Sequence, residues 1–236
     1  MRICGMQKLT LVDYPGKFAA TVFTGGCNLR CPFCQNAALV TRAGETADIP
    51  VEEVLTFLKT RVGKLDGVCI SGGEPLLQSN LADFIRSVRA LGFSVKLDTN
   101  GCFPERLAAL LDENLLDYVA MDVKAPPEKY PLVVGVPDFD VTPVLKSAAL
   151  LKASCISYEF RTTLVGSLHE LSDMDGIGRI VKGVPVYYLQ NFEDSGDIVG
   201  FSDSTQTAAL GGFSSEALAA FRDAAAPYAG KVVLRN

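Results

Sequence analysis

Three of the seven cysteines lie within a run of eight residues, and their type and spacing suit metal chemistry. They are Cys27, Cys31 and Cys34, in the order Cys-Asn-Leu-Arg-Cys-Pro-Phe-Cys. Thiolates this close together can converge on one soft metal centre. Gly25 and Gly26 come directly before them, and glycine lets the backbone approach a bulky cofactor closely. The run therefore predicts a metal centre on the loop that leaves an early strand.

Three kinds of site are compatible with the cysteine spacing alone. A structural zinc site needs four ligands, so a fourth would have to come from one of the scattered residues Cys4, Cys69, Cys102, Cys155 or His169. A redox dithiol would use Cys31 and Cys34 but would leave Cys27 unexplained. A [4Fe–4S] cluster takes four cysteines when fully ligated, so three would leave one iron open to a substrate or cofactor.

A second motif favours the iron–sulfur interpretation. Phe33 stands just before the last cysteine, and Ser71-Gly72-Gly73-Glu74-Pro75 follows the next expected strand. The two motifs together resemble the signature of the radical S-adenosylmethionine superfamily. In that family the glycine-rich motif lies along the methionyl amino group, which suits glycine backbone and a nearby carboxylate.

Further segments resemble one branch of that superfamily. Lys8–Gly16 and Thr24–Asn28 closely resemble the activating proteins of anaerobic ribonucleoside-triphosphate reductase, and the runs from Asp98 to Gly101 and from Asp122 to Lys124 resemble glycyl-radical-enzyme activases as a group. The resemblance covers about residues 5–165 well and the rest loosely. Gln35 departs from it, because histidine is more common after the third cysteine.

The resemblance implies a role for each matching residue. Three irons of a [4Fe–4S] cluster would be held by Cys27, Cys31 and Cys34. S-adenosylmethionine would be bound by Phe33 near the adenine, Gly72, Gly73, Glu74 and Asp98 around the methionyl amino group, Asn100 beside them, Lys124 at the carboxylate or ribose, and Gln190 or Asn191 at the nucleoside. A monovalent cation would lie near Asp98, Thr99 and Asp122.

The same resemblance implies an enzyme that makes a radical on a partner. It would cleave S-adenosylmethionine reductively and generate a glycyl radical on anaerobic ribonucleotide reductase, with electrons from a flavodoxin or ferredoxin-type donor. One alternative keeps the radical chemistry but acts on a small molecule, as the similar 7-carboxy-7-deazaguanine synthases do. Another is a non-catalytic, zinc-stabilised binding protein.

Short apolar runs alternate with helix-like stretches, which predicts βα units and a parallel sheet. Expected strands are Ala19–Thr24, Gly67–Ser71, Ser94–Asp98, Tyr118–Val123, Ile156–Leu164 and Pro185–Leu189. Expected helices are Val51–Val62, Leu81–Leu91, one from Pro104, one after Thr142-Pro143, Glu170–Val181 and Ser215–Ala225. Six such units predict an α/β fold with an incomplete (β/α)6-type open barrel, because a full eight-unit barrel needs about 250 residues. Polar residues follow the strands, which places the chemistry at their carboxyl ends.

Composition limits the remaining possibilities. The chain has 236 residues, a formal charge of −5, 48% hydrophobic and 21% charged residues, which suits a folded domain. The acidic balance argues against nucleic-acid binding, and no apolar run is long enough for a membrane span. Seven cysteines without a leader segment predict the reducing cytoplasm. We expect one domain over residues 1–236, with a core at about 17–190 and a C-terminal extension at 191–236.

Several residues also have plain structural interpretations. We expect Cys69 and Cys155 to be buried in strands, Cys4 and Cys102 to be incidental, and His169 to lie on the surface or in a first helical turn. Asp98 and Lys124 could form an ion pair with each other at the barrel rim. Arg161 could pair with Glu159 or Asp122. The Pro-rich segment 125–140 could be a lid, a partner-binding loop or a surface connection, and the polar segment 191–212 is expected to be a loop.

Overall fold

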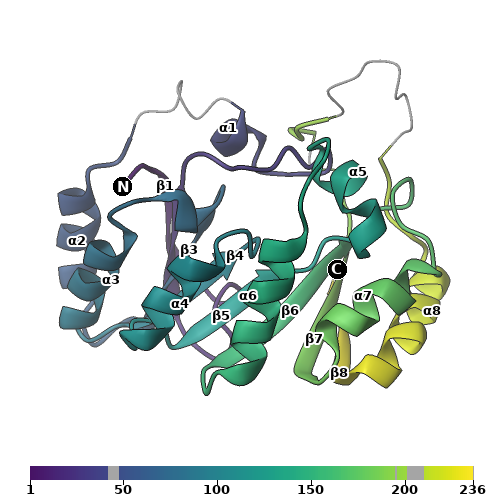
Figure 1. Ribbon diagram of the computed structural model, residues 1–236. Coiled ribbons are helices and arrows are strands. Elements are labelled where there is room, and N and C mark those ends of the chain that lie inside the picture. Colours follow the sequence, from purple (N-terminus) through teal and green to yellow (C-terminus); the bar gives the residue numbers. More distant parts are fainter. Residues whose placement is uncertain (42–47, 195, 201–209, 236) are drawn as a thin grey trace.

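The computed structural model describes residues 1–41, 48–194, 196–200 and 210–235, and the strands of this part form one open sheet. The eight strands follow the order of the chain across the sheet (Figure 1). Their bounds are β1 (Ile3–Thr10), β2 (Ala19–Thr24), β3 (Gly67–Gly72), β4 (Ser94–Thr99), β5 (Tyr118–Asp122), β6 (Ser157–Leu164), β7 (Val184–Asn191) and β8 (Ala229–Arg235). β1 runs antiparallel to β2, and all other neighbours are parallel. The sheet is therefore an open parallel barrel with one antiparallel edge.

The longer helices cover the outer face of the sheet (Figure 1). They are α2 (Val51–Lys59), α3 (Leu81–Ala90), α4 (Pro104–Asp112), α6 (Thr142–Ala153), α7 (Asp173–Val181) and α8 (Ser215–Ala225), with the short α1 (Ala37–Val40) and α5 (Tyr130–Val134) at the carboxyl ends of the strands. Three 3-10 turns complete the described elements: η1 (Pro75–Leu77), η2 (Pro127–Lys129) and η3 (Ala226–Tyr228). In α3 the residues Leu81, Phe84, Ile85 and Val88 are buried, the spacing expected of a helix with one face on the core. No helix in the described part of the chain is long and apolar enough to cross a membrane.

The six strands and six helices expected from the sequence are confirmed, with small shifts at their ends. The sheet is wider than expected, because β1 and β8 extend its two edges. β8 pairs with β7 along Val184–Gln190, so the segment expected to be an extension completes the same sheet. Both added strands are only partly buried, which explains why their sequences lack a continuous apolar run.

Side chains alternate between the two faces of each strand, and the inner face is polar. On β6, Arg161 and Thr163 line an internal cavity, whereas Phe160 and Leu164 are buried in the core. A closed parallel barrel fills its interior with branched apolar residues. Here the interior instead carries hydroxyl, carboxylate, guanidinium and ammonium groups, so the open barrel has room and charge for a polar ligand.

Two segments that the sequence leaves as loops lie against the cysteine-bearing loop. In segment 125–140, η2 and α5 form, and the Val134 carbonyl accepts a hydrogen bond from the Arg30 amide at 2.9 Å. Gly135 has φ of 65° and lies so close to Arg30 that a side chain would clash. The expectation of an irregular surface connection is therefore wrong for this segment, because it contains helical turns and supports the cysteine loop. A role as a lid or partner-binding loop stays a prediction.

The second support comes from segment 191–212, of which residue 195 and residues 201–209 lie outside the described residues. The Val199 and Gly200 amides donate to the Cys34 and Pro32 carbonyls at 3.2 and 2.9 Å. The Gln35 side-chain amide donates to the Glu193 carbonyl at 2.6 Å. These bonds fix the shape of the cysteine loop from the β7 side, and they give Gln35 a structural use.

Candidate active site

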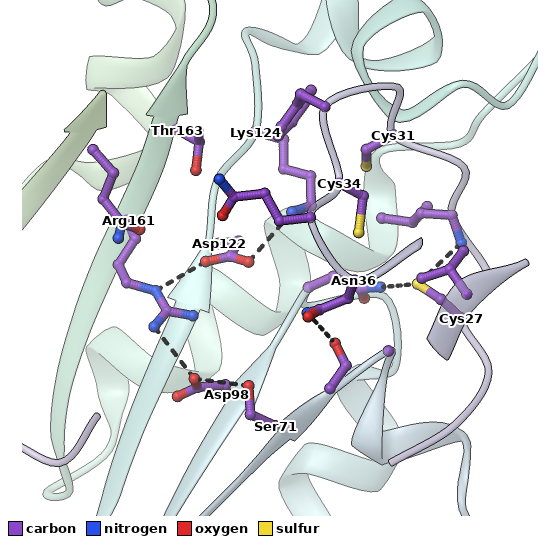
Figure 2. A pocket seen from close by; sticks show the side chains of 18 of the residues that line it. Cys27, Cys31, Cys34, Asn36, Ser71, Asp98, Asp122, Lys124, Arg161 and Thr163 are labelled. Carbon is purple, nitrogen blue, oxygen red and sulfur yellow. Dashed lines mark hydrogen bonds and ion pairs between the residues drawn. The ribbon is translucent and has the colours of Figure 1, made fainter. Parts of the chain in front are cut away.

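A cavity of about 400 Å³ opens at the carboxyl ends of the strands, and most of the expected site residues line it (Figure 2). Of the residues singled out from the sequence, it is lined by Cys27, Cys31, Phe33, Cys34, Gly72, Gly73, Asp98, Thr99, Asn100, Asp122, Lys124, Gln190 and Asn191. Glu74 is the exception. Residues more than 160 positions apart in the sequence thus share one cavity, as expected for a parallel α/β fold.

The three cysteines enter the cavity from the loop between β2 and α1 (Figure 2). All three are free thiols. The Leu29 amide lies 3.4 Å from the Cys27 sulfur, and the Asn100 side-chain amide lies 3.8 Å from it. Burial raises the pKa of Cys31 to about 12, although the nearby Lys124 ammonium opposes this. A buried thiol needs a positive centre to become a thiolate, so the donor set fits a bound metal cluster.

Beside the cysteines runs a chain of five charged side chains, shown for the most part in Figure 2. Along the chain the signs alternate, and the members are Lys96, Asp98, Arg161, Asp122 and Lys124. The Arg161 guanidinium bridges the two carboxylates, with nitrogen–oxygen distances of 3.4 Å to Asp98 and 3.0 Å to Asp122. Three cations and two anions leave a net charge of +1 beside the thiols.

The outer end of this chain is Lys124, whose ammonium lies 3.3 Å from an Asp122 oxygen and 5.9 Å from the centre of the Phe33 ring. Burial acts to lower the pKa of Lys124, but the neighbouring acidic groups, Asp122 first and then Cys31 and Cys34, together outweigh burial and hold the pKa above its usual value. Burial likewise acts to raise the pKa of Asp122, and Arg161 and Lys124 hold it down at about 2. Both groups are therefore charged at neutral pH.

The Glu74 carboxylate turns away from the cavity and binds the protein instead. It is fully buried and accepts hydrogen bonds from the Leu76 amide at 3.0 Å, the Thr99 hydroxyl at 2.9 Å and the Asn100 amide at 2.7 Å. Burial raises its pKa to about 7, against the effect of the Asn100 and Leu76 amides. The placement does not support the expectation that this side chain pairs with an ammonium. Through these hydrogen bonds Glu74 connects the end of β3 to the end of β4.

The two glycines before Glu74 allow a close approach of backbone to backbone. Gly72 has φ of 112°, and a side chain there would clash with the Thr24 backbone. A side chain on Gly73 would clash with the Gly26 backbone. The glycine-rich motif therefore packs directly against the loop that carries the cysteines, which brings the two sequence motifs together.

The side chains of three expected site residues already form hydrogen bonds within the protein. The Asn100 amide donates to the Asn28 side chain at 2.9 Å, and its oxygen accepts from the Cys102 amide at 3.0 Å. The Asn191 amide exchanges two hydrogen bonds with the Phe213 backbone, at 2.8 and 3.1 Å. Thr99 donates to Glu74. They line the cavity but chiefly hold its walls.

Three structural expectations are wrong. Asp98 and Lys124 do not pair with each other, because Asp98 contacts Lys96 and Arg161 whereas Lys124 contacts Asp122. His169 is not on the surface: it is buried before α7, where its Nδ1 accepts from the Val165 amide at 3.1 Å and its Nε2 lies 2.8 Å from the Lys124 carbonyl. The Nε2 nitrogen therefore donates, and the ring connects the ends of β5 and β6.

Cys155 was expected in a strand but is exposed, because β6 begins two residues later. Cys69 is buried as expected. Arg161 does pair with Asp122, whereas Glu159 pairs with Arg235 of β8.

Four further residues line the cavity to which the sequence analysis gave no role in the site. The Asn36 amide donates to the Gly72 carbonyl at 3.0 Å, and the Ser71 hydroxyl donates to Asp98 at 3.1 Å. Asp13 accepts from the Thr21 hydroxyl at 2.5 Å, and Thr163 lies on the wall beside Arg161. Ser71 and Thr163 could have been found from the alternation of their strands. Asn36 and Asp13 lie outside regular strands and carried no such signal.

The fold and the site together are those of a parallel α/β protein that holds a thiol-bound cofactor at the carboxyl ends of its strands. The model of the Radical SAM superfamily matches residues 21–173, and the chain belongs to that superfamily. It is therefore a radical SAM enzyme, and membership implies a [4Fe–4S] cluster and S-adenosylmethionine as its cofactors. The alternative of a non-catalytic zinc-binding protein is wrong.

Individual relatives give a finer comparison. The chain is 34% identical over 195 residues to a putative glycyl-radical enzyme activating enzyme of Methanocaldococcus jannaschii, covering 81% of this chain and 80% of that protein. It is 38% identical over 132 residues to a 7-carboxy-7-deazaguanine synthase of Methanopyrus kandleri, covering 48% of this chain and 52% of that protein. It is 32% identical over 141 residues to a pyruvate formate-lyase-activating enzyme of Listeria monocytogenes, covering 55% of this chain and 56% of that protein. The chain thus spans about half the length of the last two.

A solved structure shows the same fold. The crystal structure of Streptococcus suis SuiB bound to S-adenosylmethionine matches with a TM-score of 0.64 at 12% identity, covering 92% of this chain and 52% of that one. At that identity the match describes the architecture, and it agrees with the open parallel barrel seen here.

Proposed function

We propose that the protein is an activase that generates a glycyl radical on a partner enzyme, and that the partner is an anaerobic ribonucleoside-triphosphate reductase. The observation that carries the proposal is that three free thiols and the paired charges of Asp98, Arg161, Asp122 and Lys124 open into one cavity. The relative with the widest coverage among those compared carries an activating-enzyme name. The resemblance of Lys8–Gly16 and Thr24–Asn28 to the reductase activators favours anaerobic ribonucleoside-triphosphate reductase as the partner.

The bound cofactors supply the chemistry. A [4Fe–4S] cluster held by Cys27, Cys31 and Cys34 and S-adenosylmethionine in the cavity beside it would together supply one-electron reductive cleavage of the carbon–sulfur bond and removal of a Cα hydrogen from a glycine of the partner. A flavodoxin or ferredoxin-type protein would supply the electron. The protein contributes binding, orientation and exclusion of side reactions.

The chain's own residues divide this work. Cys27, Cys31 and Cys34 would hold the [4Fe–4S] cluster. Lys124 carries the free end of the charge chain and suits the methionyl carboxylate, because a charge-assisted hydrogen bond there is strong. Phe33 lies buried at the cavity wall beneath the Lys124 ammonium and offers an apolar surface for the adenine.

Backbone and hydroxyl groups suit the remaining parts of S-adenosylmethionine. Gly72 and Gly73 line the cavity beside Ser71 and Asp98, and this wall suits the methionyl ammonium. Gln190 of β7 also lines the cavity. Its side chain has no hydrogen-bond partner among the described residues, so it is available to bind the nucleoside. Asn191 instead holds Phe213 and supports the cavity wall.

A 7-carboxy-7-deazaguanine synthase-like reaction is the second candidate, because such an enzyme is 38% identical to part of this chain. That match covers about half of the chain, whereas the activating enzyme of Methanocaldococcus jannaschii matches most of it. We therefore place the small-molecule reaction second. We also propose, from composition, that the chain works as a single cytoplasmic domain.

Electron paramagnetic resonance separates the two candidates. Reduced, cluster-loaded protein is mixed without oxygen with S-adenosylmethionine and the anaerobic reductase, and a glycyl-radical doublet is expected on the reductase. A reductase whose radical-site glycine is replaced by alanine is the matched control and should give none. Deoxyadenosine formed only when a small pterin is added, with no radical on the reductase, would instead support the synthase-like reaction.

A further inference from the structure

The inner end of the charge chain is Lys96, a lysine buried in the barrel wall. Its side chain is 2% exposed and does not line the cavity. Its ammonium contacts one carboxylate oxygen of Asp98 and lies 3.9 Å from the Cys69 sulfur. A buried ammonium is stable only beside a counter-charge. Because Lys96 and Asp98 are two residues apart on β4, both side chains point to the same face of the sheet.

This arrangement leaves the Asp98 carboxylate with no oxygen free of a positive neighbour. One oxygen faces Lys96, and the other faces Arg161 at 3.4 Å and the Ser71 hydroxyl at 3.1 Å. The Arg161 and Lys96 cations outweigh the effect of burial and lower the pKa of Asp98. The carboxylate is therefore held, charged and oriented, from two sides.

The same contacts bear on the monovalent cation that the sequence resemblance suggested at Asp98, Thr99 and Asp122. Alkali cations need several converging oxygen ligands. The Asp122 oxygens face Arg161 at 3.0 Å and Lys124 at 3.3 Å, and the Thr99 hydroxyl is used by Glu74. An added cation would meet three positive side chains, so these residues do not fit one.

We propose that Lys96 is a positioning residue, an internal counter-ion that orients Asp98, and that it makes S-adenosylmethionine binding independent of a monovalent cation. The inference rests on the proposed function, since S-adenosylmethionine is the ligand. The two carboxylates at the suggested cation site are then neutralised by three fixed cations of the protein, without an ion from solution.

The first test uses the unaltered, cluster-loaded protein. The dissociation constant of S-adenosylmethionine is measured by anaerobic calorimetry in potassium, sodium and tetramethylammonium chloride at equal ionic strength. Equal ionic strength removes general screening effects, and tetramethylammonium is too large to enter a carboxylate site. The three constants should agree within about twofold, a negligible difference in binding free energy. Binding that is at least about fivefold tighter in potassium or sodium would overturn the inference.

The second test removes the ammonium. In Lys96→Met, S-adenosylmethionine should bind about tenfold more weakly in tetramethylammonium chloride, the scale of one lost charge-assisted contact. Potassium or sodium should restore much of that loss, because an Asp98 oxygen becomes available. Lys96→Arg should stay independent of the cation. Lys146→Met, at an exposed position on α6, is the matched control and should behave as the unaltered protein.

The outcomes separate this inference from the proposed function. Lys96→Met that binds as tightly as the unaltered protein and ignores the cation would overturn the role of Lys96. If Lys96→Met fails to load its cluster, the cation series on the unaltered protein still decides. Unaltered protein that binds no S-adenosylmethionine in any salt would overturn the proposed function itself.

Discussion

Replacing Lys124 with methionine tests the proposed contact to the methionyl carboxylate. The change removes the ammonium and keeps most of the apolar stem. Asp122 loses a neighbour at 3.3 Å but keeps the Arg161 guanidinium at 3.0 Å, so no buried carboxylate is left unpaired. The Lys124 backbone amide still donates to the Tyr130 hydroxyl at 3.0 Å. The fold and the cysteine loop should therefore survive.

The expected cost falls on ligand binding. Loss of one charge-assisted hydrogen bond weakens binding by about 1.5–3 kcal/mol, which is roughly 10- to 150-fold in the dissociation constant. Iron and sulfide content should match the unaltered protein, and anaerobic calorimetry measures the affinity. Lys129→Met is the matched control, because Lys129 also pairs with an aspartate, Asp173 at 2.8 Å, but lies outside the cavity lining. It should bind S-adenosylmethionine normally.

Two results would refute this reasoning. Unchanged affinity in Lys124→Met would show that the ammonium serves only its contact with Asp122. Loss of iron in Lys124→Met, with normal iron content in Lys129→Met, would show that Lys124 is needed for cluster assembly rather than for binding S-adenosylmethionine.

Three further predictions concern the cluster, the Glu74 contacts and pH. Alanine at any one thiol of the cysteine run should abolish the [4Fe–4S] cluster, whereas alanine at any other cysteine should leave iron content intact; an essential cysteine outside the run would contradict the open iron. The two sets are Cys27, Cys31 and Cys34 against Cys4, Cys69, Cys102 and Cys155. Glu74→Gln places an amide N–H donor opposite a backbone or hydroxyl donor that now binds the carboxylate, so one of these hydrogen bonds is lost. The free energy of unfolding measured by urea titration should fall by about 1–3 kcal/mol. An unchanged midpoint of unfolding would contradict the buried contacts of Glu74. Burial lowers the pKa of His169, the only histidine. The neutral ring therefore stabilises the fold fully above the unfolded pKa of about 6.5, and this stability is lost as pH falls through the lower folded pKa. Nuclear magnetic resonance titration measures the pKa of this ring, and a pKa of 6.5 or above would contradict its burial.

The core of the fold could be predicted because its signals are local. Strands such as Gly67–Gly72 and helices such as Leu81–Ala90 carry the spacing of apolar residues that their environment demands. The edge strands β1 and β8 could not be found this way. β1 is half exposed and antiparallel, and β8 gains its place through β7 and through the contact between Arg235 and the buried Glu159. Both depend on partners far away in the sequence.

The location of the site could be predicted, but the direction of several side chains could not. Asp98 lies near the end of β4 and Lys124 just after β5, and both reach the cavity as expected. The sequence suggested a pair between them, but Asp98 pairs with Lys96 two residues before it and Lys124 with Asp122 two residues before it. Arg161, from β6, joins the two pairs. Glu74 carries a motif carboxylate, yet three donors from neighbouring segments turn it inward. Tertiary hydrogen bonds decide such cases, and they have no local sequence signal.

The central claim is that the protein removes a hydrogen atom from a glycine of a partner, and isotope transfer tests it most directly. The anaerobic reductase is prepared with deuterium on the Cα atoms of its glycines and mixed, without oxygen, with reduced protein and unlabelled S-adenosylmethionine. The 5′-deoxyadenosine is then analysed by mass spectrometry. Our account expects one deuterium in the deoxyadenosine, together with a glycyl radical on the reductase. Deoxyadenosine that forms in the presence of the labelled reductase but carries no deuterium would contradict it.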